Sequence, residues 1–198
     1  MAIDVEIDID GAIRGLTELE QRHVPFAAAR ALTQTAQQGQ RRVRQHLPQV
    51  FTLRNDWTRR GIRVRPANKR TLQAAVFSRD WYLGDHETGG TRTPRDARAL
   101  SVPVGARGST SQTIPRSRRP ARLLSRPRHF IARMASGKAG IFQRVGRARL
   151  PIRLMYSFED DVTFDDTLNM TGVVGETATN DFPVRFHEAV DQALATAR

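Results

Sequence analysis

The clearest pattern of apolar positions is a helical one in the first third of the chain. Small or apolar residues recur there at spacings of three and four, while Gln and Arg occupy the opposite face. Pro25 suits a first helical turn, and Pro48 is expected to end the helix. The pattern predicts one long helix over 25–47 that packs closely through its small residues. These are Ala28, Ala31, Leu32, Thr35, Gly39, Val43 and Leu47.

Alternating apolar and polar positions predict strands around this helix. Residues 3–9 alternate apolar and acidic residues, as a half-buried strand does. Segments 62–65 and 71–78 are expected to form a hairpin. After the middle of the chain, 130–134 and 141–145 flank a Gly-containing turn, and further strands are expected at 99–104 and 152–158.

Three shorter helices are also predicted. One begins near Asn55 or Asp56, both good N-caps, and stops at Gly61. A second is expected within 161–170. The third is capped by Asn180 or Asp181 and has an apolar face formed by Phe182, Phe186, Ala189, Val190 and Leu194.

Residues 91–129 stand apart because they are rich in Pro and Arg. Within them, 105–122 reads as a flexible loop that cannot build a core of its own. The sequence therefore predicts a single α+β domain over 1–198, with 91–129 as an extended arm. A twisted, mostly antiparallel sheet of four or five strands is expected to carry the long N-terminal helix and the C-terminal helix.

The charge is distributed unevenly along the chain. The net charge is +12, but 1–20 carry −5 and 154–198 carry −7, whereas 21–91 carry +9 and 92–153 carry +15. Opposite charges on different surfaces can steer copies of one chain, or acidic neighbours, into assembly. Nearly all the basic residues are Arg, which suits bidentate carboxylate and phosphate contacts. A GC-rich coding sequence gives the same bias.

Composition also limits which cellular compartment and which cofactors are expected. The chain has no cysteine, which excludes disulfides and thiolate metal sites and fits assembly in a reducing cytosol. No apolar run is long enough for a transmembrane helix, and the acidic N-terminus is unlike a signal peptide. We therefore expect neither a membrane association nor a bound cofactor.

Motifs of catalysis are missing from the sequence. There is no cysteine nucleophile, Gly-x-Ser-x-Gly, Walker A or Gly-x-Gly-x-x-Gly motif, and the five histidines are scattered. The best candidate is Asp85-His86-Glu87, which would fit a metal-dependent hydrolase. Adjacent side chains point in different directions, so a polar turn that caps a strand end is the favoured interpretation. The sequence predicts no catalytic residue and no enzyme.

Two charged clusters remain as candidate interaction sites. One is acidic and suits either a divalent cation or, as we favour, a solvated or subunit-facing patch; it comprises Glu159, Asp160, Asp161, Asp165 and Asp166. The other is basic and suits phosphate contacts, a docking arm for an acidic protein, or a solvated loop. Its members are Arg116, Arg118, Arg119, Arg122, Arg126 and Arg128.

Several segments, in order, resemble the minor tail protein Z family of long-tailed bacteriophages and the related tail-completion and neck proteins. They are the helix start at 26–36, the segment 51–64, and the turn containing His86, Glu87, Gly89 and Gly90. Later come 141–144, the strand near 154–156, and the helix through Phe182 and Phe186. The resemblance spans 16–196, and it matches residues 105–128 and the acidic N-terminal strand least.

This resemblance implies a non-enzymatic structural protein of the virion. Such proteins form a ring, usually of six copies, at the head-proximal end of the tail, where the tail joins a filled head and the DNA end passes. The implied partners are copies of the chain itself and neighbouring terminator, tube or head-connector proteins, with the host cytoplasm as the place of assembly. No small-molecule substrate is implied. The alternative from the residues alone is a nucleic-acid-binding protein that grips phosphates through the Arg-rich arm.

Overall fold

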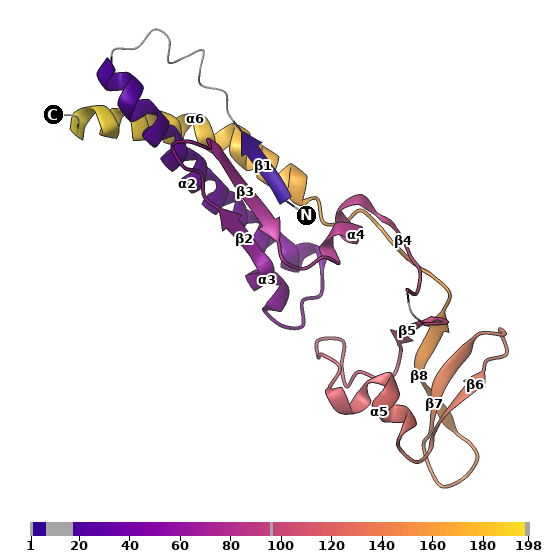
Figure 1. The fold of residues 1–198 in the computed structure, drawn as a ribbon. Coiled ribbons are helices and arrows are strands. Elements are labelled where there is room, and N and C mark those ends of the chain that lie inside the picture. Colours follow the sequence, from indigo (N-terminus) through magenta and orange to yellow (C-terminus); the bar gives the residue numbers. More distant parts are fainter. Residues whose placement is uncertain (1, 7–17, 96, 197–198) are drawn as a thin grey trace. The chain divides into compact units, whose positions relative to one another are not determined.

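The computed structural model describes residues 2–6, 18–95 and 97–196, and the chain divides into two compact units. Unit 1 comprises Met1–Thr88 and Asp166–Arg198, and unit 2 is Gly89–Asp165. Unit 2 is therefore inserted into the sequence of unit 1, where a single domain over 1–198 was expected. Both helices and antiparallel sheets are present, so the α+β class is confirmed (Figure 1).

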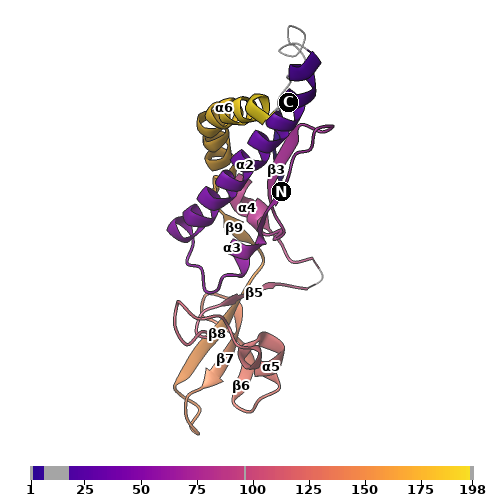
Figure 2. The same cartoon turned by 90° about the vertical axis from the view of Figure 1, so that its left-hand side faces the viewer.

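Unit 1 is built on a long helix that lies between a second helix and a small sheet. Helix α2 (Glu18–Val50) packs against α6 (Met170–Thr196), and the two lie side by side in both views (Figure 1, Figure 2). On its other side α2 contacts an antiparallel sheet in which β3 (Gln73–Ser78) lies between β1 (Ala2–Glu6) and β2 (Ile62–Arg65). The predicted hairpin is β2–β3. Two short helices complete the unit, α3 (Trp57–Gly61) and α4 (Leu83–Thr88).

The core of unit 1 forms along the small-residue face of α2, as the helical pattern predicted. Ala27 and Ala31 pack with Ala189 of α6, beside partly buried Phe182 and Phe186. A larger cluster joins α2 to the sheet and to the start of α6, with Leu32, Ala36, Val43, Leu47, Ile62, Val76, Leu168, Met170 and Val174 among its buried members. Small side chains permit this close approach of the backbones, and dense packing then supplies many dispersion contacts.

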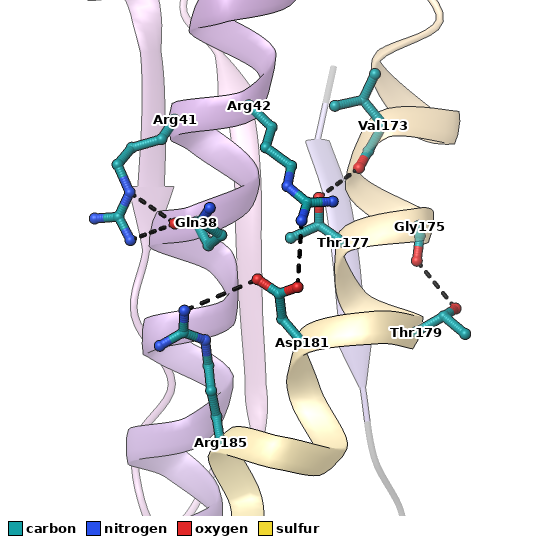
Figure 3. Close-up of polar contacts among 9 residues, drawn as sticks. All are labelled: Gln38, Arg41, Arg42, Val173, Gly175, Thr177, Thr179, Asp181 and Arg185. Carbon is teal, nitrogen blue, oxygen red and sulfur yellow. Dashed lines mark hydrogen bonds and ion pairs between the residues drawn. The ribbon is translucent and has the colours of Figure 1, made fainter.

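A polar contact also joins the two long helices. Asp181 of α6 lies between two guanidinium groups, with Arg42 of α2 at 3.4 Å and Arg185 of its own helix at 3.8 Å (Figure 3). The hydroxyl groups of Thr177 and Thr179 instead donate to carbonyl groups one turn earlier in α6. The Asp181 pairs are partly buried, which makes them stronger than fully solvated ones.

Unit 2 contains a four-stranded antiparallel sheet of order β5-β8-β7-β6. Its strands are β5 (Leu100–Pro103), β6 (His129–Arg133), β7 (Ala139–Arg144) and β8 (Ile152–Glu159), and β6–β7 is the predicted hairpin. A separate two-stranded ladder pairs β4 (Gly90–Arg92) with β9 (Val162–Phe164). The described residues thus form nine strands in three sheets, not four or five strands in one.

The predicted arm is ordered where a flexible loop was expected. Segment 105–122 contains the short 3-10 helix η1 (Arg116–Arg118) and the first residues of the short α-helix α5 (Pro120–Leu124). Leu123 is only 1% exposed and packs with Ala106, Ile141, Met155 and Tyr156. Residues 105–115 do lack helix and strand, but the prediction missed that Ala106 within the segment and Leu123 just after it belong to the buried cluster of unit 2.

The helix boundaries also differ from the predicted ones. Helix α2 extends beyond 25–47 and includes both Pro25 and Pro48, because each proline removes only one backbone donor in a helix fixed by packing. Helix α6 begins at Met170 rather than at Asn180 or Asp181. The short helix predicted at 161–170 is absent, and β9 lies there instead. Part of the predicted first strand, 7–9, lies outside the described residues.

Two glycines in unit 1 give opposite predictions for substitution by alanine. A Cβ on Gly39 would lie 3.6 Å from Val76 Cγ2 and 3.7 Å from Val174 Cγ2, which is ordinary contact. Gly39→Ala should raise the free energy of unfolding by about 0.5–1 kcal/mol, because glycine is a poor helix former. A Cβ on Gly61 would lie 2.7 Å from the carboxylate of Asp80, so Gly61→Ala should lower it by about 1–3 kcal/mol. Urea unfolding of the three proteins tests both signs, and a destabilised Gly39→Ala would contradict the packing described for α2.

Candidate functional site

The turn that resembles the tail-protein family is a structural junction within unit 1. Glu87, in α4, places its carboxylate at the first residues of α6. Its Oε2 accepts the backbone N–H of Met170 at 2.7 Å, and its Oε1 accepts that of Thr171 at 2.8 Å and the Thr171 hydroxyl. A carboxylate in this position satisfies otherwise unpaired donors and interacts favourably with the helix dipole.

His86 joins the same junction to the C-terminal end of α2. The Leu168 N–H donates to the His86 carbonyl at 2.8 Å, and the Leu168 carbonyl lies 3.0 Å from His46 Nε2 of α2. The His86 ring also packs edge-on against Phe51, with 4.9 Å between ring centroids. The turn therefore fixes the start of α6 against the end of α2.

Gly89 and Gly90 lie where the chain passes from unit 1 into unit 2. Both have positive φ, 67° and 136°, which glycine adopts without a steric penalty. Gly90 opens β4, whose partner β9 ends just before the chain returns to unit 1. The outgoing and returning segments are thus paired by a ladder within unit 2 and joined by the Glu87 cap within unit 1.

This geometry supports the structural interpretation of the Asp85-His86-Glu87 cluster. Both carboxylate oxygens of Glu87 accept backbone hydrogen bonds, so this side chain is committed to holding a helix. In the described part of the chain, no group of three or more His, Cys, Asp or Glu residues is arranged to hold a metal ion. The role of the turn is to position α6, whereas the sequence suggested the cap of a strand end.

The six arginines of the predicted basic cluster all lie in unit 2 and are all exposed. They follow η1, α5 and the connection to β6: Arg116, Arg118, Arg119, Arg122, Arg126 and Arg128. Within the residues that the structure describes, no carboxylate pairs with any of the six. We call this set the η1–α5 arginines; it presents uncompensated positive charge on an ordered segment.

Tyr156 of β8 fixes the backbone that carries these arginines. Its hydroxyl donates to the Arg118 carbonyl at 3.0 Å, and its ring belongs to the buried cluster of unit 2. Burial raises the pKa of Tyr156, and the positive charges of Arg107 and Arg119 offset part of that rise. The phenol therefore keeps its proton and its donor role at neutral pH.

The predicted acidic patch is only partly a cluster. Glu159, Asp160 and Asp161 line an open hollow of about 750 Å³ together with Arg98, Arg133 and Lys138. Asp165 and Asp166 follow β9 and do not line it. Acidic and basic side chains share this hollow, so the three carboxylates are locally compensated.

Glu159 is the best-paired member of the patch. Its Oε2 accepts from Lys138 and its Oε1 accepts from Ser157 at 2.5 Å. The hydrogen bonds from Lys138 and Ser157 lower the pKa of Glu159, and the same contact with Glu159 raises the pKa of Lys138. Both groups are therefore charged at neutral pH, and the pair weakens in acid as pH falls through the lowered pKa of Glu159.

A second basic site, in unit 1, was missed by the sequence analysis. Arg44 of α2 and Arg59, Arg60 and Arg63 around α3 line an open hollow of about 400 Å³ with one acid, Asp56. The local signal was the four arginines within 59–65, which were interpreted only as part of a short helix, a strand and the family resemblance. Arg44 is distant in sequence, so only the fold brings it to the others.

The Glu87 cap gives a testable consequence. Glu87→Gln should lower the free energy of unfolding by about 1 kcal/mol, because an amide oxygen accepts fewer of these bonds and carries no charge for the helix terminus. Glu176→Gln, an exposed change in the second turn of α6 and away from the capped N–H groups, is the matched control and should alter stability by less than about 0.5 kcal/mol. Thermal and urea unfolding measure both. Equal effects in the two variants would show that the cap does not hold α6.

Comparison with known proteins adds no assignment to this geometry. No family model, no curated protein and no solved structure matches the chain. Among the described residues, none of the helices combines the length and apolar character needed to span a membrane. The functional assignment therefore depends on the residues themselves.

Proposed function

We propose that this chain is a structural protein of a tailed bacteriophage virion, a tail-completion or neck component that forms a ring at the head–tail junction. The observation that carries the proposal is that three of the segments resembling the tail-protein family pack together in unit 1, whereas 141–144 and 154–156 belong to the sheet of unit 2. The 26–36 segment supplies buried residues of α2, and Phe182 and Phe186 pack against them from α6. The turn through His86, Glu87, Gly89 and Gly90 joins the same two helices.

The role of that turn supports a structural rather than a chemical task. A catalytic glutamate would present its carboxylate oxygens to a substrate. Both carboxylate oxygens of Glu87 instead accept hydrogen bonds from backbone N–H groups of α6. The proposal therefore assigns the chain no reaction, no cofactor and no small-molecule substrate. Its implied work is assembly: joining the tail to a filled head and allowing the DNA end to pass.

The charge distribution supplies the means of assembly. The η1–α5 arginines are exposed and uncompensated, whereas α6 carries exposed acids along its length, among them Glu176, Glu188 and Asp191. Oppositely charged surfaces on one chain favour association between copies or with acidic neighbours. We propose a ring, with six copies as the resemblance implies, and terminator, tube or head-connector proteins as neighbours.

The oligomeric state tests this proposal. Light scattering after gel filtration should give about six times the chain mass of 22.3 kDa at micromolar concentration. Raising the salt concentration should weaken the ring because its contacts are charged. A monomer at every concentration, in low salt as well as high, would contradict the proposal.

A second candidate function is nucleic-acid binding by the η1–α5 arginines. The specific observation that favours it is their exposure on a segment anchored by Leu123 and by the Tyr156 hydroxyl, which places several guanidinium groups without acidic partners. Each phosphate contact that a protein makes steepens the salt dependence of binding. This candidate requires no ring.

One triple variant distinguishes the two candidate functions through the salt dependence of DNA binding. If the arginines contact phosphate, Arg116→Gln/Arg118→Gln/Arg119→Gln should lower the slope of log affinity for duplex DNA against log salt by about 2.7, at about 0.9 per contact. The control, Arg30→Gln/Lys69→Gln/Arg70→Gln, removes three exposed charges from unit 1. Equal slopes in the two variants, with the ring intact in both, would favour the virion role without DNA contact by these arginines.

A further inference from the structure

The surface around α3 combines positive charge with an exposed aromatic ring. We call it the α3 surface and define it by Trp57, Arg59, Arg60 and Arg63, with Arg44 of α2. All five lie in unit 1, so the α3 surface is distinct from the η1–α5 arginines of unit 2. The four arginines share their hollow with a single acid, Asp56.

Most of the positive charge on this surface is uncompensated. Arg44 donates to the carbonyl groups of Arg59 at 3.0 Å and Ile62 at 2.8 Å, which orient the guanidinium without cancelling its charge. Arg59 and Asp56 form an exposed pair at 3.4 Å, of the kind that contributes little. Arg60 and Arg63 are exposed, and in the described ranges no carboxylate pairs with either. Guanidinium groups in this state suit phosphate.

Trp57 opens α3 and is anchored by one edge. Its indole N–H donates to Asp80 Oδ1 at 2.9 Å, while the residue as a whole is 70% exposed. Asp80 is only 8% exposed and also accepts the Tyr82 hydroxyl, which in turn contacts Thr58. Burial raises the pKa of Tyr82, so that the hydroxyl stays a donor at neutral pH. The ring is thus held in place by a partly buried network, while 70% of the residue's surface is exposed.

A fixed, exposed aromatic ring on the same short helix as Arg59 and Arg60 matches the needs of unpaired nucleic acid. Bases stack on aromatic side chains whatever their sequence, and phosphates pair with arginine. A protein partner would favour a charge-depleted, apolar centre around the tryptophan. Here the residues next to Trp57 along α3 are Thr58, Arg59 and Arg60. Duplex DNA keeps its bases stacked inside and offers none to the ring.

We infer that the α3 surface binds single-stranded nucleic acid, with Trp57 stacking on a base while Arg59, Arg60, Arg63 and Arg44 contact phosphates. The site takes an unpaired polynucleotide without base-edge recognition, since it offers a stacking face and cations. It needs neither the ring nor the η1–α5 arginines. Its failure would leave the proposed virion role untouched.

The charge is tested with the full chain and a labelled oligothymidylate of about 12 nucleotides. Arg60→Gln/Arg63→Gln should weaken binding at least about tenfold and lower the slope of log affinity against log salt by about 1.4, at about 0.7 per contact with a single strand. The matched control is Arg30→Gln/Arg70→Gln, two exposed arginines elsewhere in unit 1. The control should change the affinity less than about twofold. Equal losses in the two double variants would overturn the inference.

Stacking is tested separately from charge. The chain has two tryptophans, so Trp81→Phe leaves Trp57 as the only indole, and oligothymidylate should quench its fluorescence while inorganic polyphosphate should not. Trp57→Ala should weaken oligothymidylate binding about tenfold and leave polyphosphate binding unchanged. Absent quenching, or equal loss for the two ligands, would reduce the surface to a general anion site and overturn the inference. Tighter binding of polyglutamate than of oligothymidylate would overturn it in favour of an acidic protein. The quenching measurement keeps Trp57 and every arginine in place, so it does not depend on the folding of the other variants.

Discussion

The close packing of α2 between α6 and the sheet is the contact on which the rest of unit 1 depends. Buried alanines, a glycine and a buried threonine on α2 let its backbone lie close to α6 and to the sheet. Ala189 and Val174 are the buried residues of α6 that pack against this face. In such a close-packed contact each small side chain contributes little to the free energy of folding. The stabilisation comes from the large number of dispersion contacts made at native packing density. The contact also has little room for larger residues. The Asp181 ion pairs and the Glu87 cap both require α6 to lie where this contact holds it.

The junction between the units follows from the same placement. With the start of α6 fixed by Glu87 and Leu168, the two crossings of the chain, at Thr88–Gly89 and Asp165–Asp166, are joined on the unit 1 side by hydrogen bonds. The β4–β9 ladder joins them again within unit 2. Bringing the ends of a long insertion together costs entropy that grows only slowly with its length. A whole folded unit can therefore be inserted at this point with little penalty to the core of unit 1.

The features that the sequence predicted are those set by neighbouring residues. The α2 pattern and the β2–β3 and β6–β7 hairpins have local causes, namely periodicity and turn chemistry. The polar turn predicted at His86 and Glu87 is instead part of the short helix α4. The start of α6 was misplaced because its cap, Glu87, is 83 residues from Met170. The order of 105–122 was missed because Leu123 and Ala106 become core residues only against β7 and β8. The α3 surface was missed because Trp57 is held by Asp80, and Arg44 by the carbonyls of α3 and β2.

The strong preference for arginine over lysine has a physical basis at some positions and none at others. Arg44 donates through two different nitrogens to two carbonyl groups. The planar guanidinium of arginine can make both hydrogen bonds at once, whereas the single ammonium of lysine would make them poorly. Among the described residues, the exposed side chain of Arg126 has no hydrogen bond or ion pair that a lysine would lose. A chain of net charge +12 repels itself when compact, and the described ion pairs compensate only a few of its arginines. In the described part of each unit, exposed arginines gather around α3 and along η1 and α5, and these are the surfaces on which the proposed assembly, or a polynucleotide, would supply negative charge at high density.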